Sequence, residues 1–158
     1  MISTTVLAVG LTTASAHSTT GVGANGKFLN PADTANWIFS PTTVLPQFGT
    51  SRPVTGSYSV TYFKNKVSVY LPYFGKAYAG ADIYSGNSPL DFTSVNYTME
   101  KQPAKKGGWT IILVPKDYSE VESMRFTFYD NGNATLDVTM RSRSPISFYG
   151  NVETGKRK

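Results

Sequence analysis

The chain lacks cysteine altogether and has a single histidine, His17, among its 158 residues. Without cysteine there is no disulfide framework, thiol nucleophile, Cys-ligated zinc, iron–sulfur cluster or lipid-modified cysteine. With one histidine, every mechanism that needs two imidazoles is also excluded. We therefore expect neither a catalytic residue set nor a cofactor or metal ion.

Charge is also scarce. Charged residues make up 16% of the chain, against roughly 25% in an average soluble domain. The formal charge is +5, but three of the fifteen basic residues are the last three, 156–158, and the rest balance as twelve against ten acidic residues. A short basic end is usually solvated. No Lys/Arg-rich helix or RNA-recognition signature is present, so we expect no nucleic-acid partner.

The sequence is instead rich in hydroxyl and aromatic side chains. It has 19 Thr, 16 Ser, 10 Tyr, 9 Phe and 2 Trp. Threonine and the aromatic residues suit the pleated, half-buried surface of a β-sheet. This composition predicts a strand-rich domain.

The N-terminus is typical of a secretory signal peptide cleaved after Ala16. Residues 2–11 are mildly apolar, and Ala14-Ser15-Ala16 has the small-x-small pattern that signal peptidase recognises. No Lys or Arg precedes the apolar run, so a disordered polar leader is the alternative. The run is too short and polar to span a bilayer, which needs about 20 apolar residues, and we expect no transmembrane segment. We predict a signal segment (1–16), a flexible leader (17–27), one β domain (28–152) and a basic tail (153–158).

Alternating apolar residues predict hairpins through the domain. A two-residue turn at Lys64-Asn65 places Tyr62 opposite Val67 and gives residues 58–71 one apolar face. Strands are also expected at 94–99 and 109–114, on either side of the exposed loop QPAKKGG. Residues 31–37, with Asn30 as a cap, predict one short helix.

A third hairpin surrounds Asn131-Gly132-Asn133. A three-residue loop there sets Phe128 opposite Leu136 and Phe126 opposite Val138, on one apolar face. Strands near 38–45 and 146–152 bring the total to about eight. The fold class is therefore all-β: an antiparallel meander that forms a small lipocalin-like barrel, which we favour, or a two-sheet sandwich. A barrel of this size is filled by side chains or admits one small ligand.

Four segments together resemble a known family. LPYFGKAYAG (71–80), GGWTIIL (107–113), FTFYDNGNATLDV (126–138) and ISFYG (146–150) are similar to the exported bacterial domain-of-unknown-function 4251 family of Gram-negative gut and oral bacteria. The resemblance covers roughly residues 38–152. It implies a signal or lipoprotein leader and a small β-rich domain, and it assigns no activity or catalytic residue. This chain departs from the family by lacking a lipobox cysteine and by carrying NSPL (87–90) where a glycine-rich stretch is expected.

Six residues are candidates for ligand binding. Tyr73, Phe74, Tyr78 and Tyr84 lie in a glycine-rich aromatic segment, which predicts either a ligand mouth that stacks on flat groups or a plug at the end of the barrel. Arg141 and Arg143, two residues apart on one predicted strand face, suit a carboxylate or phosphate, or are exposed charges that discourage edge pairing.

These features favour a non-catalytic, exported binding domain, periplasmic or associated with the cell envelope but not anchored through a cysteine lipid. Its partner would be a small molecule, a glycan or an envelope protein, and we expect a monomer. One alternative is a glycan hydrolase, which would need two carboxylates across a cleft. The other is a purely structural accessory of a surface assembly.

Overall fold

The structure, a computed structural model, describes residues 36–79, 81, 86–105 and 107–154. The expected signal segment and leader (1–27) lie outside this part of the chain, as does most of the basic tail. So does the expected helix over 31–37 except for its last two residues, and Trp37 opens the first strand instead. Within the described residues, no helix has the length and hydropathy needed to cross a membrane.

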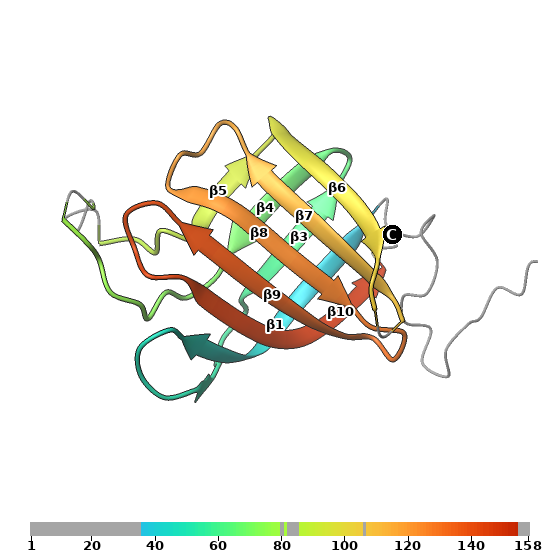
Figure 1. The fold of residues 1–158 in the computed structure, drawn as a ribbon, viewed down its shortest axis with the longest axis horizontal. Helices are drawn as coiled ribbons and strands as arrows, with labels where there is room; N and C mark the ends of the chain where they lie inside the picture. The colour runs from blue at the N-terminus through green and yellow to red at the C-terminus, as the bar shows by residue number, and fades with distance from the viewer. Residues whose placement is uncertain (1–35, 80, 82–85, 106, 155–158) are drawn as a thin grey trace, which may run out of the picture.

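In the described part of the chain, ten antiparallel strands form one sheet that curls into a nearly closed barrel (Figure 1). Its order is β5-β4-β3-β1-β10-β9-β8-β7-β6, with β2 paired to β1 at the side. The strands are β1 (Trp37–Pro46), β2 (Arg52–Pro53), β3 (Ser59–Phe63), β4 (Lys66–Tyr70), β5 (Asp91–Ser94), β6 (Tyr97–Pro103), β7 (Trp109–Pro115), β8 (Val121–Phe128), β9 (Asn133–Met140) and β10 (Ile146–Thr154). The all-β prediction and the preferred barrel are confirmed.

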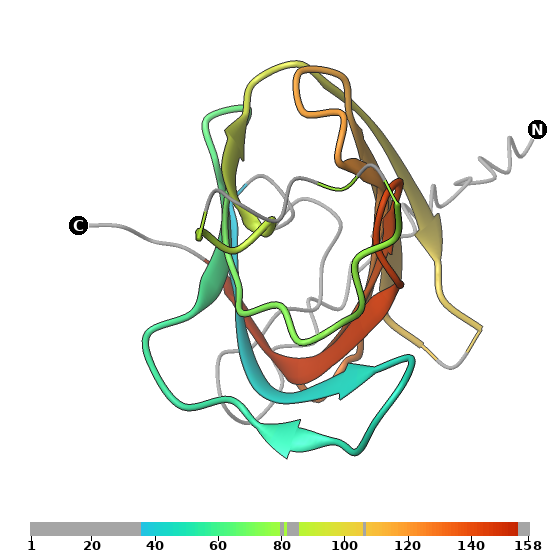
Figure 2. The ribbon, with the colours of Figure 1, turned by 90° about the vertical axis from the view of Figure 1, so that its left-hand side faces the viewer.

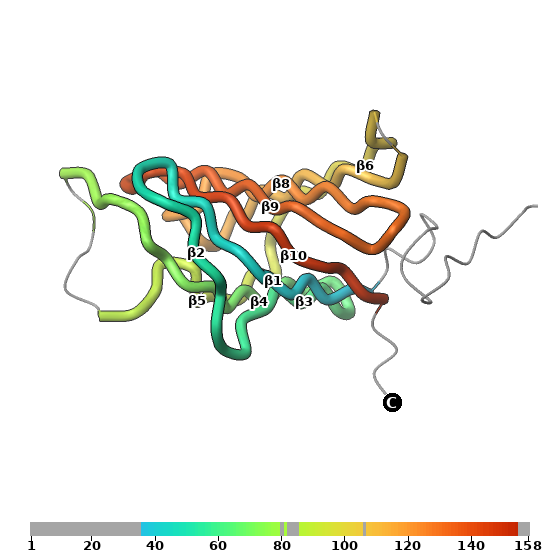
Figure 3. The backbone as a smooth tube through the Cα atoms, turned by 90° about the horizontal axis from the view of Figure 1, so that it is seen from below, coloured from blue at the N-terminus to red at the C-terminus, as the bar shows by residue number. Residues whose placement is uncertain are grey.

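Most neighbours in this order are also consecutive strands of the chain, whereas the consecutive strands β5 and β6 stand at its two ends. The pairing of β1 with β10 joins the first and the last described strands. Seen down its end, the sheet wraps around a central interior (Figure 2). From below, the barrel is flattened into two walls, one containing β3, β4 and β5 and the other β8 and β9 (Figure 3).

The interior is occupied by large apolar side chains from both walls. The Trp37 ring packs against rings from both walls, with its centroid 4.9 Å from that of Phe126, 5.1 Å from Phe128 and 5.7 Å from Tyr62. Trp37, Phe126, Phe128 and Phe148 are fully buried. Of the two predicted arrangements for a small barrel, the described core corresponds to the one filled by side chains.

The first predicted hairpin forms with the expected register. Tyr62 pairs with Val67 and Val60 with Val69. Lys64 and Asn65 have φ of 48° and 59°, as a two-residue turn between twisted strands requires. β3 begins at Ser59 and β4 ends at Tyr70, so the expected pair of Tyr58 with Leu71 lies outside both strands.

The hairpin of β8 and β9 has a three-residue loop, as predicted, but the loop is Asp130-Asn131-Gly132. Phe126 consequently pairs with Leu136 rather than with Val138. The reason is Gly132, whose φ of 82° places it at the last, left-handed position of the loop. The two-residue shift keeps the same apolar face inward, so the core is unchanged.

The predicted strand over residues 94–99 is broken into a corner. Ser94 ends β5, Val95 is 69% exposed, and β6 begins at Tyr97. Asp117 accepts hydrogen bonds from the Val95 and Asn96 amides at 2.8 and 3.0 Å and from Ser94 Oγ at 2.6 Å. Because the Asp117 carboxylate accepts hydrogen bonds from both amides, residues 94–97 do not continue as one strand. The chain turns here from one wall of the barrel to the other.

Candidate binding site at the open end of the barrel

The segment that follows β4 crosses the open end of the barrel (Figure 2). Leu71 and Pro72 are buried. The Leu71 amide donates to the Leu90 carbonyl at 2.9 Å, and Ser88 Oγ donates to the Leu71 carbonyl at 2.6 Å. Pro72 has no amide hydrogen to extend the β4 ladder, so the chain leaves the sheet here.

On the far side this segment is joined to the residues that follow β9. Tyr73 Oη donates to the Ser144 carbonyl at 2.7 Å, and the Lys76 amide donates to Ser144 Oγ at 2.9 Å. The Ser144 amide in turn donates to the Lys76 carbonyl, and the Tyr78 amide donates to the Ser142 carbonyl. Residues 71–79 therefore cover the barrel end, as in the plug alternative. We call these residues the plug.

Tyrosine hydroxyls hold the edges of this end in place. Burial raises the pKa of Tyr73, an effect that its hydrogen bond to Ser144 partly offsets. Burial also raises the pKa of Tyr118, whose hydroxyl donates to the Pro89 carbonyl at 2.9 Å and whose ring stacks on Phe92 at 4.1 Å. A raised pKa keeps each hydroxyl protonated and able to donate its hydrogen bond.

A cleft of about 520 Å³ lies beside the plug, and we call it the mouth. Aromatic rings, the backbone of two loops and one guanidinium line it. The lining residues are Tyr58, Pro72, Tyr73, Phe74, Gly75, Gly86, Asn87, Ser88, Pro89 and Arg143.

Arg143 is the charged residue among the described lining residues of the mouth. Its Nε lies 3.6 Å from Glu120 Oε2, and its Cζ lies 5.7 Å from the centroid of the Tyr73 ring. Ser142 Oγ donates to the other carboxylate oxygen of Glu120 at 2.8 Å. The guanidinium is thus held in place between an aromatic face and a carboxylate, with only 12% of the side chain exposed.

The prediction that Arg141 and Arg143 share a strand face is wrong. Strand β9 ends at Met140, and Arg143 forms an isolated antiparallel bridge with Ala77 of the plug. That bridge turns Arg143 toward the mouth, whereas Arg141 stays exposed and does not line it.

The structure brings three of the six candidate residues together. Tyr73, Phe74 and Arg143 line the mouth, Tyr78 is exposed outside it, and Tyr84 lies outside the described residues. Sequence reasoning missed Tyr58, whose ring stacks on Tyr70 with centroids 5.0 Å apart. The sequence pattern predicts Tyr58 on the apolar face of the first hairpin, and no sequence signal distinguishes it from that face; β3 begins one residue later, at Ser59, in the structure.

Two more cations lie over aromatic rings near the plug. Arg52 Cζ is 5.5 Å from the centroid of Phe74, and Lys76 Nζ is 4.9 Å from that of Phe48. Cation–π contacts of this kind hold exposed cations close to apolar surface. The rim of the mouth therefore combines positive charge with exposed aromatic faces.

Comparison with known proteins places the fold in a family. A sequence model described as "Domain of unknown function (DUF4251)" matches residues 30–152. The crystal structure of a DUF4251 family protein from Bacteroides eggerthii DSM 20697 is similar, with a TM-score of 0.53 and 13% identity, over 78% of this chain and 82% of that one. No curated protein matches significantly. With four-fifths of its length matched and the same barrel in a solved relative, the chain belongs to the DUF4251 family.

Proposed function

We propose that this protein is a non-catalytic binding domain that holds a small molecule in the mouth. The observation that carries the proposal is the convergence of Phe74, Tyr58 and Arg143 on one cleft of about 520 Å³. Ligand sites are typically concave, mostly apolar and about 300–1,000 Å³ in volume, with few polar groups that fix orientation.

The chemistry of the walls favours a ligand with a flat or ring-shaped apolar body and a negative group. Phe74 and Tyr58 offer ring faces for stacking. The Arg143 guanidinium, the only charged group among the described lining residues, suits a carboxylate, sulfate or phosphate oxygen. Arg52 and Lys76 add positive potential at the rim.

The glycan-hydrolase alternative has no comparable support. It needs two carboxylates about 5–9.5 Å apart in one cleft. No Asp or Glu is among the described residues that line the mouth, and Glu120 is engaged by Arg143 and Ser142.

The proposal is tested by thermal shift and calorimetry with the purified chain. The panel contains anionic ring-bearing amphiphiles of bile-acid type, fatty acids and neutral counterparts of both. We expect saturable binding of an anionic ring compound, weakened by Phe74→Ala and unchanged by Tyr149→Ala, which removes an aromatic ring of similar exposure from β10, outside the cleft (45% and 52%). Binding equally reduced by both variants, or absent across the panel, would contradict the proposal and leave an envelope partner or a structural role to be sought by pull-down.

We further propose that the domain functions after export, in the periplasm or at the cell envelope. The apolar run at 2–11 and Ala14-Ser15-Ala16 support this. Mass spectrometry of the protein made in a Gram-negative host should find a periplasmic chain that begins at or near His17. An intact cytoplasmic chain beginning at Met1 would refute export.

A further inference from the structure

A second surface of distinct chemistry lies on the outer face of the wall formed by β7, β8, β9 and β10. Cross-strand pairing aligns Thr110 with Thr127, Thr127 with Thr135, and Thr135 with Tyr149. The four side chains lie on the face opposite the core, because their strand neighbours such as Ile111, Phe126 and Leu136 are buried inside. They form a continuous row across four strands.

A second row runs beside the first. The Tyr129 amide donates to the Asn133 carbonyl at 2.9 Å, and Asn133 pairs with Asn151. Each of these residues is two positions from a member of the first row, so it faces the same way. We call the two rows together the hydroxyl–amide patch.

No residue of this patch carries a charge, and the next row of the same face shows the contrast. There Arg125 pairs directly with Asp137, and Ser147 Oγ donates to Asp137 Oδ1 at 2.6 Å. In that row the paired residues Arg125 and Asp137 carry opposite charges. Arg125 and Lys105 also border a hollow on this face, whereas the two rows themselves are uncharged. The patch itself is complementary to an uncharged ligand with many hydrogen-bonding groups.

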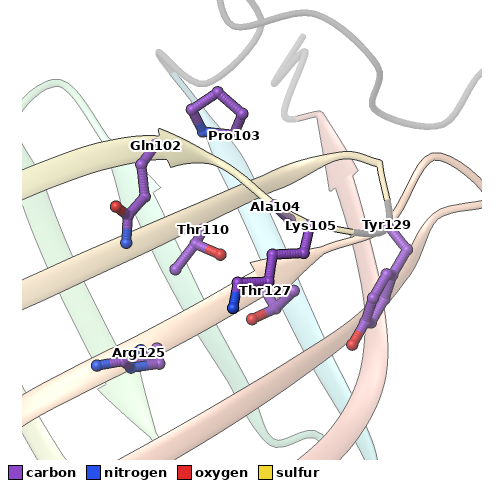
Figure 4. Close-up of a pocket in the computed structure, with 8 residues that line it drawn as sticks. All are labelled: Gln102, Pro103, Ala104, Lys105, Thr110, Arg125, Thr127 and Tyr129. Carbon is purple, nitrogen blue, oxygen red and sulfur yellow. The ribbon is translucent and has the colours of Figure 1, made fainter.

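The patch is hollowed on both sides of Tyr129. One hollow, of about 380 Å³, has Thr110 and Thr127 on its floor, Arg125 at one end, and Gln102 and Lys105 projecting from β6 and the loop after it (Figure 4). The other, of about 410 Å³, is lined by residues that include Thr135, Tyr149, Asn133 and Asn151. Tyr129 lines both hollows and separates them.

The loop between β6 and β7 forms one wall of the first hollow. Gly107 and Gly108 both have φ of 83°, which side chains rarely adopt. The Ala104 amide donates to the Gly108 carbonyl at 3.1 Å and closes the loop. The two glycines therefore constrain the backbone of the loop that carries the lining residues Ala104 and Lys105.

We propose that the hydroxyl–amide patch binds an extended, uncharged oligosaccharide that lies across the strands. Tyr149, 52% exposed, and Tyr129 present ring faces on which sugar rings can stack. Each asparagine amide offers a donor and an acceptor, and each threonine hydroxyl offers both, which matches the hydroxyl pairs of a sugar. With strands about 4.8 Å apart, the first row spans about 14 Å, the length of a few sugar units.

The site is independent of the mouth, since no residue of the patch lines that cleft. Its test is a titration of the ¹⁵N-labelled full chain with neutral β-linked hexasaccharides of glucose, xylose, mannose and N-acetylglucosamine. We expect one of them to shift the amide signals of Thr127, Thr135 and Tyr149.

Tyr149→Ala should weaken that binding about three- to tenfold. The matched control is Tyr70→Ala, which removes a tyrosine of nearly equal exposure (49%) from β4 in the opposite wall and should leave the affinity unchanged. Thermal melts show whether each variant folds. If Tyr149→Ala does not, Thr127→Val, which keeps the side-chain volume and removes the hydroxyl, should weaken binding in its place.

Three results would overturn the inference. The first is no amide shift with any hexasaccharide at millimolar concentration. The second is a set of shifts confined to residues 72–75 and 86–89, which would place the sugar in the mouth. The third is an affinity that Tyr70→Ala lowers as much as Tyr149→Ala does.

Discussion

The mouth and the hydroxyl–amide patch are built in opposite ways. The mouth is made of loops whose backbone is held by individual side chains: Tyr73 holds Ser144, Ser88 holds Leu71, and Tyr118 holds Pro89. The patch is made of adjacent strands whose backbone is held by continuous ladders. The shape of the mouth therefore depends on a few polar atoms, whereas the shape of the patch depends on the sheet as a whole.

The difference bears on dynamics and on ligand choice. Regions held by few hydrogen bonds open locally at lower free energy than core strands do, so the mouth is the part of this molecule best suited to adapt to a ligand. The patch presents a fixed spacing and suits a ligand with a repeating structure. Three substitutions test this contrast.

The largest effect is expected from Gly108→Ala, at the wall of the patch. A Cβ there would overlap the Phe128 carbonyl oxygen, and the φ of 83° is itself strained for alanine. We expect the free energy of unfolding in urea to fall by about 2–4 kcal/mol. Gly86→Ala, with φ of 66° but no neighbour within 4 Å, should cost only about 1 kcal/mol. Equal costs would mean that the strand at Phe128 yields, and that the patch is less rigid than we infer.

A smaller and more local effect is expected from Tyr73→Phe, at the plug. The change removes the hydrogen bond to the carbonyl of the buried Ser144 and should cost about 1–2 kcal/mol. Hydrogen exchange of the Lys76 and Tyr78 amides should accelerate while that of β8 and β9 does not. Tyr70→Phe, at a half-exposed ring, should change stability by less than about 0.5 kcal/mol. Equal acceleration throughout the barrel would show that the plug is not an independent unit.

The smallest effect is expected from Asp117→Asn, at the corner between β5 and β6. Hydrogen bonds from Ser94, Val95 and Asn96 lower the pKa of Asp117 from 3.8 to about 2. A carboxyl whose folded pKa is depressed stabilises the fold fully above about pH 4, and that contribution is lost as the pH falls through 2. The variant should therefore melt at a lower temperature than the wild type at pH 7, and the difference should close toward pH 2.

Glu122→Gln is the control for this pH dependence, because it removes an exposed carboxylate that makes no hydrogen bond to the described residues. Its melting temperature should follow the wild type at both pH values. A difference for Asp117→Asn that persists unchanged at pH 2 would show that the corner does not depend on the ionised carboxylate.

Local pattern predicted the hairpins well, because a one-residue slip would turn every apolar side chain of a strand outward. Tyr62 opposite Val67 follows from that rule and from the Lys64-Asn65 turn. The same rule left a two-residue shift undetected in the hairpin of β8 and β9, since such a shift keeps the same face inward. Gly132 decided that register through its backbone conformation.

The candidate site was only partly predictable. Aromatic density in residues 71–84 indicated Tyr73 and Phe74, and both line the mouth. The partners of Arg143 could not be read from the sequence, because Glu120 and Tyr73 are distant from it along the chain and meet it only where the plug crosses to the end of β9. The patch could not be predicted either, because its threonines come from three strands and are aligned only by the pairing register of those strands.

The abundance of threonine and aromatic residues, together with alternating apolar residues, by itself determined an all-β domain of hairpins. These are properties of composition and of a two-residue period, and each can be read within one strand or turn. The tertiary structure alone decided the closure of β1 on β10, the half-buried position of Arg143, and the alignment of Thr110, Thr127 and Thr135. They depend on which strands meet and in what register, and that is fixed by packing one shared core.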